Sequence, residues 1–365
     1  MSGVYISYPF CAQKCTYCNF ASGVFPRALE EDYLEALEQE ILSWNWAWTP
    51  ETVYIGGGTP SRMKLEALER ILGKIPGRPW KEATIEAAPG TITAELARAW
   101  SDFGITRVSL GVQSFVRAEI ARTGRKHSAE QVAVELDLLA SAGIRNVNID
   151  LIAGLSGQTP ESWDESLRWI ERLRPAHVSV YMLEIDEDSR LGQEILLNGE
   201  RYGAPDVPSD ERTAEFYETA VERLHRIGIE RYEISNFAVP GFESRHNLKY
   251  WRLEPYVGFG ADAHSFDGGL RWQNVETVKE YVGRWRRGEP VREEASTADE
   301  TEERFFVGLR LMAGIRPKPE ERLRFDVPIQ RFLDEGLLEE EDGVLRLTSR
   351  GVLLSNEVFQ EFVTV

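Results

Sequence analysis

The sequence predicts an α/β protein in which helices cover a parallel β-sheet. Two observations lead to this fold class: short, nearly uninterrupted apolar segments recur six times in the first half of the chain, and helical segments follow them after short linkers. Strands have this composition when crossover helices cover both faces of their sheet. A closed barrel, a partial barrel and an open doubly wound sheet share the pattern, so the pattern alone leaves these three architectures open.

The predicted elements follow one another in a regular order. Short apolar segments predict strands at residues 4–7, 52–55, 83–86, 107–113, 147–151 and 178–182. Apolar residues at helical spacing predict helices at 31–43, 65–75, 94–103, 129–142, 160–173 and 209–227. In the first helix, Tyr33, Leu37 and Ile41 share one face because they recur every four residues. We therefore predict a core domain at 1–230.

The tail of the chain has a different character. It predicts a helix up to Met312, a helix up to Phe332, a hairpin at 337–347 that turns at 342–343, and a helix at 349–362. Three helices and a two-stranded wing indicate a small winged-helix-like α+β domain at 296–365, joined to the core by a segment at 231–295. The wing is acidic throughout 339–342. A phosphate backbone would be repelled there, so we expect no nucleic-acid partner.

Composition narrows the class of protein further. The 365 residues carry a net charge of −18, whereas nucleic-acid-binding domains usually show a basic footprint. No apolar segment approaches the roughly 20 residues that a membrane-spanning helix needs. The first residues lack the basic region and apolar core of a secretory signal. We expect a protein that is not itself a membrane protein and that works in the cytoplasm, where thiols stay reduced.

All three cysteines of the chain lie in one short segment after the first strand. Cys11, Cys15 and Cys18 have the spacing Cys-x3-Cys-x2-Cys. Three thiolates on one loop can take three corners of a four-iron cluster and leave the fourth iron open to a ligand. The alternatives are a disulfide, a zinc site and three unrelated buried cysteines. An odd cysteine number disfavours a disulfide framework, and a zinc site wants a fourth ligand, which does not lie nearby in sequence. The spacing favours the cluster.

Polar residues interrupt the apolar pattern at one kind of place. Glu86, Gln113, Asp150 and Glu184 lie at or just past the C-terminal ends of four successive predicted strands. Binding sites of (βα) barrels are built at this edge. One such residue would be ordinary loop polarity, but four in succession favour a binding edge.

The cysteine spacing and its flanks resemble a known family. With the aromatic Tyr17 before the third cysteine, the motif is similar to that of the radical S-adenosylmethionine (SAM) enzymes. The flank 5–11 resembles their coproporphyrinogen oxidase-like branch, and the segments 107–115 and 150–159 match as well. The resemblance implies a six-stranded partial (βα) barrel of the TIM-like radical SAM type. It also implies a [4Fe-4S] cluster on the three cysteines and SAM on the open iron.

The same resemblance implies a set of SAM contacts. The residues that match are Tyr5, Tyr17, Gly57, Gly58, Thr59, Glu86, Gln113, Arg125 and Asp150. The glycine segment 56–60, which by itself indicates a tight turn or a close backbone approach, would bind the amino group of the methionine part. Arg125 can hold a carboxylate with two parallel donors, and Glu86 or Asp150 can accept from an amine or from ribose hydroxyls. Glu184 matches a position that meets the cofactor through its backbone.

Three further features resemble the HemW-type haem chaperones. Oxygen-independent coproporphyrinogen III oxidases carry a fourth cysteine where this chain has Phe20. The chain also starts close to its first predicted strand, which we take as a second difference from these oxidases. Residues 245–251 match the His-Asn-x-x-Tyr-Trp signature of HemW-type proteins. The resemblance implies a chaperone that binds the cluster, SAM and haem, and that passes haem to an acceptor such as a membrane-associated cytochrome. The alternatives are the oxidase itself and, less favoured, a radical enzyme that acts on another substrate, and whether SAM is cleaved stays open.

Within this signature, His246 is the predicted haem ligand. A histidine nitrogen commonly binds haem iron, and Tyr250 and Trp251 could pack on the porphyrin. Composition alone favours a structural role for His246, in which it caps a turn while the neighbouring aromatic residues pack in the core. The complete signature favours the role of a haem ligand. His264, in the matching segment Gly-x-Asp-Ala-His-Ser, is the second candidate.

Overall fold

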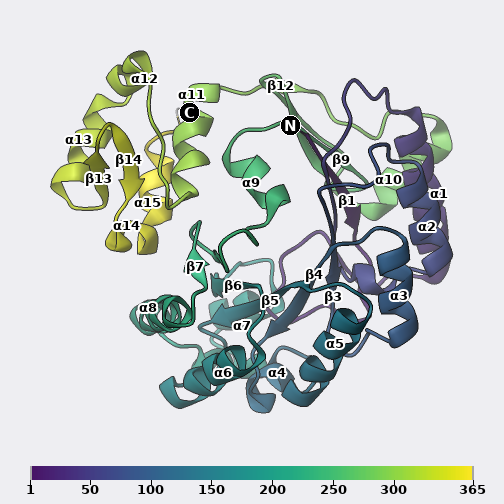
Figure 1. Cartoon of the computed structure of the whole chain (residues 1–365), viewed down its shortest axis with the longest axis horizontal. Helices are drawn as coiled ribbons and strands as arrows, with labels where there is room; N and C mark the ends of the chain where they lie inside the picture. Colours follow the sequence, from purple (N-terminus) through teal and green to yellow (C-terminus); the bar gives the residue numbers. More distant parts are fainter. Residues whose placement is uncertain (1, 364–365) are drawn as a thin grey trace.

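The computed structural model describes residues 2–363 and is organised around one 12-stranded sheet (Figure 1). Strands β1 to β6 lie side by side in chain order, and each neighbouring pair is parallel. Their bounds are Gly3–Tyr8, Thr52–Gly57, Glu82–Ala87, Arg107–Gln113, Asn146–Ala153 and His177–Met182. The two outermost strands of the sheet do not pair with each other. The predicted partial (βα)6 barrel is therefore confirmed.

Helices cover the outer face of this sheet (Figure 1). They are α1 (Arg27–Ser43), α2 (Leu65–Gly73), α3 (Ala94–Asp102), α5 (Ala129–Ser141), α6 (Pro160–Leu173) and α8 (Asp210–Arg226). Thr93, Ser128 and Ser209 start three of them, because each side chain accepts a hydrogen bond from a backbone N–H of the first turn. Four short elements that the sequence did not predict lie between the strands and the helices that follow them: η1 (Pro60–Arg62), α4 (Arg117–Arg122), α7 (Arg190–Leu196) and η2 (Arg201–Asp206).

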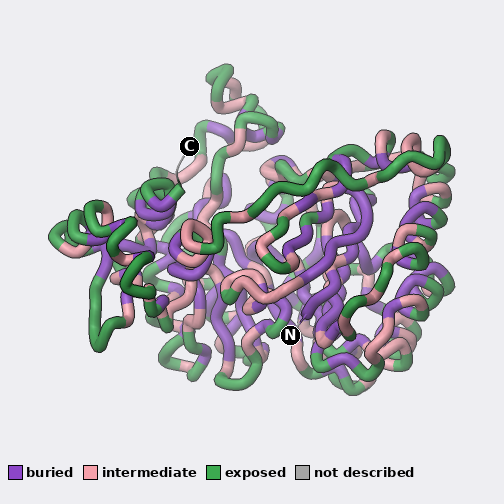
Figure 2. The backbone as a smooth tube through the Cα atoms, turned by 90° about the horizontal axis from the view of Figure 1, so that it is seen from above, coloured by how far each residue is buried: buried purple, intermediate pink, exposed green. Residues whose placement is uncertain are grey.

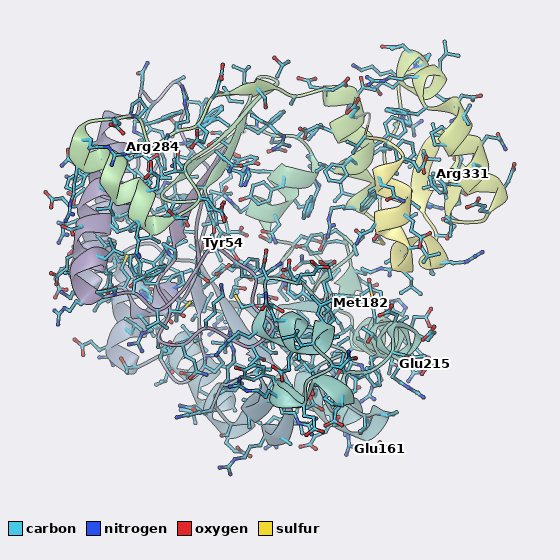
Figure 3. All side chains as sticks on the ribbon, turned by 180° about the vertical axis from the view of Figure 1, so that it is seen from behind. Tyr54, Glu161, Met182, Glu215, Arg284 and Arg331 are labelled. Atoms are coloured by element: carbon cyan, nitrogen blue, oxygen red, sulfur yellow. The ribbon has the colours of Figure 1, made fainter. Side chains whose placement is uncertain are left out.

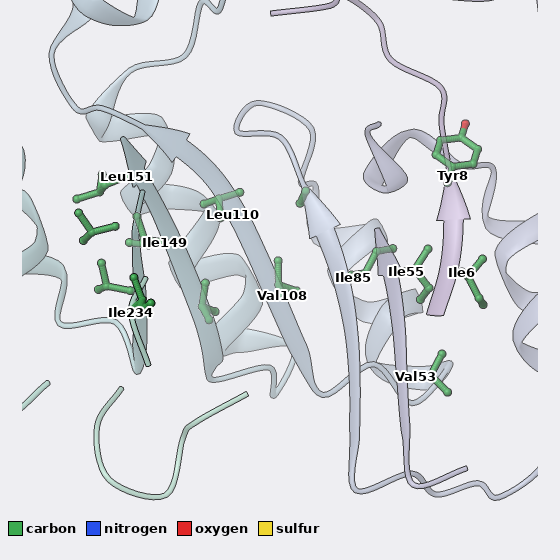
Figure 4. Packing of buried hydrophobic residues seen from close by; sticks show 14 of the residues in the cluster. Ile6, Tyr8, Val53, Ile55, Ile85, Val108, Leu110, Ile149, Leu151 and Ile234 are labelled. Carbon is green, nitrogen blue, oxygen red and sulfur yellow. The ribbon is translucent and has the colours of Figure 1, made fainter. Parts of the chain in front are cut away.

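The two faces of the sheet differ in chemistry. Ile149 and Leu151 of β5 belong to the apolar core between sheet and helices (Figure 4). Asn148 and Asp150 alternate with them and point to the opposite, inner face. There the Asn148 amide donates to Asp150 Oδ1 (2.6 Å) and to Ser109 Oγ (2.8 Å). The predicted apolar character thus applies to the outer face, and the inner face carries a polar layer.

The segment 231–295 is not a simple linker, because it extends the sheet at both edges. Beyond β6 it adds the antiparallel strand β8 (Asn236–Ala238), which pairs with β7 (Glu230–Arg231). Beyond β1 it adds β9 (Tyr256–Phe259), which pairs in parallel with β1, followed by β10 (His264–Asp267), β11 (Leu270–Gln273) and β12 (Ser296–Thr297).

Two helices belong to the same segment. Helix α9 (Arg245–Trp251) connects the two sheet edges and lies between β1 and the C-terminal module in the middle of Figure 1. Helix α10 (Val278–Arg287) packs beside α1. The segment therefore runs from one edge of the partial barrel to the other and carries the signature helix across its open side.

The C-terminal module contains the predicted helices and wing. Its elements are α11 (Glu300–Phe306), η3 (Gly308–Arg310), α12 (Pro319–Arg324), α13 (Asp326–Asp334), β13 (Leu338–Glu341), β14 (Val344–Leu347), α14 (Ser349–Leu353) and α15 (Ser355–Gln360). Asp342 and Gly343 have φ angles of 51° and 75°, as a two-residue hairpin turn requires. The predicted last helix is interrupted at Leu354, which leaves the helical conformation (φ −110°, ψ 26°).

Burial follows this architecture (Figure 2). The strands of the partial barrel are largely buried, and exposed residues line the outer helices and loops. Two backbone hydrogen bonds join the C-terminal module to the edge of the barrel: Ile234 N–H donates to the carbonyl of Arg310 (3.1 Å), and Met312 N–H donates to that of Tyr232 (3.0 Å). Among residues 2–363, no helix has the length and apolar character to cross a bilayer.

Candidate functional site

The three cysteines lie in the loop that leaves the carboxyl end of β1. All are free thiols with partly exposed side chains. The Cys11 N–H donates to the carbonyl of Gly23 (2.8 Å), which holds the two ends of the loop together. In the described part of the chain, no three His, Cys, Asp or Glu side chains gather closely enough for a single metal ion. A four-iron cluster takes each thiolate at a different iron, so the donor set fits such a cluster.

The glycine segment packs directly against this loop. Gly58 N–H donates to the Tyr8 carbonyl (2.7 Å), and Thr59 N–H donates to the Phe10 carbonyl (3.0 Å). A Cβ on Gly58 would lie 2.7 Å from the Phe10 carbonyl oxygen, and Gly57 has a φ of 113°. Only glycine fits both conditions without strain. The glycines are thus required by the close approach of the backbone that leads into Cys11.

Thr59 connects the glycine segment to the cysteines. Burial raises the pKa of the Cys11 thiol, whereas hydrogen bonds with the hydroxyls of Ser22 and Thr59 favour its thiolate. A cluster ligand must be a thiolate. The two hydroxyls therefore assist the ionised form that cluster binding needs.

Arg125 lies against the cysteine loop. Its Nε donates to Cys15 Sγ (3.2 Å), and its Nη1 donates to the Gly111 carbonyl (2.6 Å). Burial raises the pKa of Tyr17, and the charge of Arg125 opposes that rise, so the guanidinium and the phenol lie close together. The structure thus brings Arg125 and Tyr17 together with Cys15.

Glu86 ties the third strand to the glycine segment. Its Oε1 accepts from the Tyr54 hydroxyl (2.9 Å) and its Oε2 from the Gly57 N–H (3.0 Å). Burial, with a further contribution from the charge of Asp150, raises the pKa of Glu86 to about 7. Tyr54, labelled near the centre of Figure 3, stacks on the ring of Tyr5 with centroids 6.1 Å apart. Tyr5, Tyr54, Glu86 and Gly57 thus form one continuous row on the inner face.

Two further predicted contacts lie on neighbouring strands. Gln113 ends β4 in a left-handed conformation (φ 71°), where the register between β4 and β5 shifts. Such a conformation is uncommon for a residue with a side chain and often marks a functional position. Asp150 does not end its strand as predicted, because β5 continues to Ala153. Its carboxylate still belongs to the inner polar layer and accepts from Ser109 Oγ (3.3 Å).

His246 occupies a place that the sequence did not predict. Its side chain is 0% exposed. Nδ1 bonds with the Thr52 hydroxyl (2.8 Å) and Nε2 with the Tyr250 hydroxyl (2.8 Å), so both ring nitrogens have partners. Burial lowers the pKa of His246 to about 3, which keeps the ring neutral. His246 therefore anchors α9 to β2 in this structure, and its role as a haem ligand stays a prediction.

A cavity of about 440 Å³ lies beside α9. Its wall includes Tyr5, Tyr250, Trp251 and His264, and it continues to α11 of the C-terminal module. Sequence reasoning named several of these residues separately but did not bring them together, because they come from strand β1, the signature helix, β10 and the tail. No local spacing signals such a cavity.

Comparison with known proteins identifies the family. Residues 5–170 match the Radical SAM superfamily. The heme chaperone HemW of Bacillus subtilis is 35% identical over 100% of this chain and 99% of its own length. The heme chaperone HemW of Lactococcus lactis is 33% identical over 99% of this chain and 97% of its own length.

A solved structure agrees on the fold. Coproporphyrinogen III oxidase (HemN) from Escherichia coli, described as a radical SAM enzyme, superimposes with a TM-score of 0.84 at 21% identity and covers 100% of this chain and 90% of its own. At that identity the likeness shows the fold alone, whereas the full-length relatives at higher identity show the family. The chain belongs to the HemW family of the radical SAM superfamily.

Proposed function

We propose that this protein is a haem chaperone that carries a [4Fe-4S] cluster, binds SAM and haem, and transfers haem to an acceptor protein. One observation carries the proposal: three free thiols, with Arg125 against Cys15, lie at the mouth of a partial barrel in a chain that matches HemW proteins along its whole length. The acceptor and a cytoplasmic location are part of the proposal, since reduced thiols persist there.

Each cofactor would have defined partners in this arrangement. Cys11, Cys15 and Cys18 would supply three thiolates and leave one iron for the amino and carboxylate groups of SAM. Arg125 would grip the carboxylate with two donors. The contacts proposed for the remaining parts of SAM are Tyr5, Tyr17, Gly57, Gly58, Thr59, Glu86, Gln113 and Asp150. Bound SAM would supply the chemistry of a 5′-deoxyadenosyl radical if an electron from the reduced cluster cleaved it.

Phe20 supports the chaperone over the oxidase. It follows the third cysteine at the position where the oxidases carry a fourth, and its side chain is 68% exposed. A phenyl ring offers no ligand to iron, so the loop has one thiol fewer than an oxidase loop.

The test uses anaerobically reconstituted protein. Haem titration followed by its Soret band should show saturable binding, and incubation with SAM, reductant and coproporphyrinogen III should yield no protoporphyrinogen product. Transfer is then measured by adding an apo-cytochrome and following the loss of haem from the chaperone. Conversion of coproporphyrinogen III without haem binding would instead establish the oxidase.

A further inference from the structure

The cavity beside α9 has the size and lining of a site for a flat aromatic ligand. Its volume of about 440 Å³ falls within the range of small-molecule sites. Tyr250 and Trp251 of α9, Tyr256 of β9, Phe266 of β10 and Phe306 of α11 contribute aromatic rings to its wall. Aromatic walls bind planar macrocycles well, because rings gain from stacked and edge-on contacts in addition to burial.

One histidine of the chain is placed to bind iron there. His177 and His246 are fully buried with both ring nitrogens bonded, and His127 is 7% exposed. His225 is exposed but pairs with Glu230 (2.8 Å). His264 is exposed and lines the cavity, and no residue in the described range 2–363 forms a hydrogen bond with its ring.

The tyrosines of the wall are weaker candidates for the iron. A tyrosine binds haem iron as the tyrosinate. Burial raises the pKa of Tyr5, Tyr250 and Tyr256 above the ordinary value, which favours the neutral phenol in all three. An imidazole, by contrast, binds iron in its neutral form.

We propose that haem binds in this cavity with its iron coordinated by His264, and that α9 forms one wall of the site. This inference rests on the proposed function, since it locates the haem that a chaperone must carry. It assigns His246 a positioning role: Nε2 holds the Tyr250 hydroxyl and Nδ1 holds Thr52, so the signature helix presents Tyr250 and Trp251 to the ligand.

The charged side chains of the cavity wall are consistent with haem bound in this way. Asp262 lines the cavity together with His264, and burial raises the pKa of this carboxyl while the charge of His264 opposes that rise. Arg271 is held by both carboxylate oxygens of Glu303 and donates to the Tyr256 hydroxyl (3.1 Å). Since this arginine is already paired, the anionic propionates of haem should stay in solvent at the cavity mouth.

The site also lies between two parts of the molecule. Phe306 is the last residue of α11 in the C-terminal module and Val307 follows it, whereas Tyr5 comes from the first barrel strand. Bound haem would therefore contact both. The C-terminal module would in this arrangement form one wall of the haem site.

The experiment is a haem titration of wild type, His264→Ala and the matched control His225→Ala, which removes an exposed histidine outside the cavity. In His264→Ala we expect affinity for haem at least tenfold lower and a shifted Soret band, with iron–sulfur absorption unchanged. Added imidazole should restore the wild-type spectrum, because it fills the space left by the side chain and coordinates iron. His225→Ala should behave as wild type. A second variant, Val307→Trp, narrows the cavity without touching a ligand and should also weaken binding.

The outcomes separate this inference from the proposed function. If wild type binds no haem, the proposed function fails, and this inference with it. If wild type binds haem and His264→Ala retains its spectrum and affinity, the assignment of His264 is overturned while the chaperone stands. Weaker binding that imidazole does not rescue likewise overturns iron coordination by His264.

Discussion

The cysteine loop and the aromatic cavity are built in opposite ways. The cysteine loop takes its three thiols from eight consecutive residues and packs against the glycine segment beside it. The cavity takes its wall from β1, α9, β10 and α11, which are far apart in the chain. A metal site on one loop can therefore be found from spacing, whereas a site between packed elements exists only after folding.

The two regions nevertheless share one structural feature, a carboxylate that accepts a hydrogen bond from a glycine N–H. On the mouth side, Glu86 accepts from the Gly57 N–H (3.0 Å). On the cavity side, Glu40 accepts from the Gly260 N–H (2.9 Å), two residues before Asp262. Burial raises the pKa of each carboxyl to about 7. In both places a partly buried carboxylate accepts a hydrogen bond from the backbone N–H of a glycine.

The largest expected effect lies at the loop. Single replacements of Cys11, Cys15 or Cys18 by Ala should reduce bound iron and sulfide to near zero, because each removes one of three thiolates. Elemental analysis and the iron–sulfur absorption measure this. Haem titration of the same variants should be unchanged if the two regions are independent. A variant that keeps a full cluster would remove that cysteine from the ligand set.

The next prediction tests whether His246 and His264 have the different roles proposed for them. His246→Ala should lower the free energy of unfolding by about 2–4 kcal/mol, because it empties a core position and leaves the Thr52 and Tyr250 hydroxyls unpaired. Denaturant unfolding measures this, with the exposed His225→Ala as control. Residual haem should keep the wild-type Soret position. A Soret shift in His246→Ala together with none in His264→Ala would show that His246, and not His264, binds the haem iron.

A smaller effect is expected for SAM. Arg125→Ala and Asp150→Ala should each weaken SAM binding by about 10- to 100-fold, because each removes a hydrogen bond to a charged or polar group of the ligand. Equilibrium binding on reconstituted protein measures this. Arg168→Ala, an exposed arginine on α6, is the control. Unchanged affinity in both variants would argue against the strand ends as the SAM site.

The smallest effect tests the shared carboxylate feature. The folded-state pKa values of Glu86 and Glu40 are raised from 4.5 to about 7. The folded protein therefore binds more protons than the unfolded chain between these values, so stability falls as pH rises from 4.5 through 7. In Glu86→Gln and in Glu40→Gln, the decrease in the free energy of unfolding over this pH range should be about 1–2 kcal/mol smaller than in wild type. Denaturant midpoints between pH 5 and 8 measure it. Equal slopes in variants and wild type would contradict the raised pKa values.

Several features could be predicted because their causes are local. The strand and helix periods depend on neighbouring residues, and the parallel sheet follows from them. The cysteine spacing and the turn at Asp342 and Gly343 are equally local. The inner polar layer was also present in the sequence, since Asn148 and Asp150 alternate with apolar residues. Reading β5 as a continuously apolar strand hid that alternation.

The sequence by itself determined the fold class, the cysteine loop and the family resemblance, because each depends on residue types at short spacing. Only the tertiary structure decided the roles of the histidines and the place of the segment 231–295. His246 and His264 lie in the same segment, yet one is enclosed by Thr52 and Tyr250 and the other faces a cavity. A side chain becomes a ligand or a core residue according to what distant elements pack against it, and that arrangement is set only when α9 packs against the sheet.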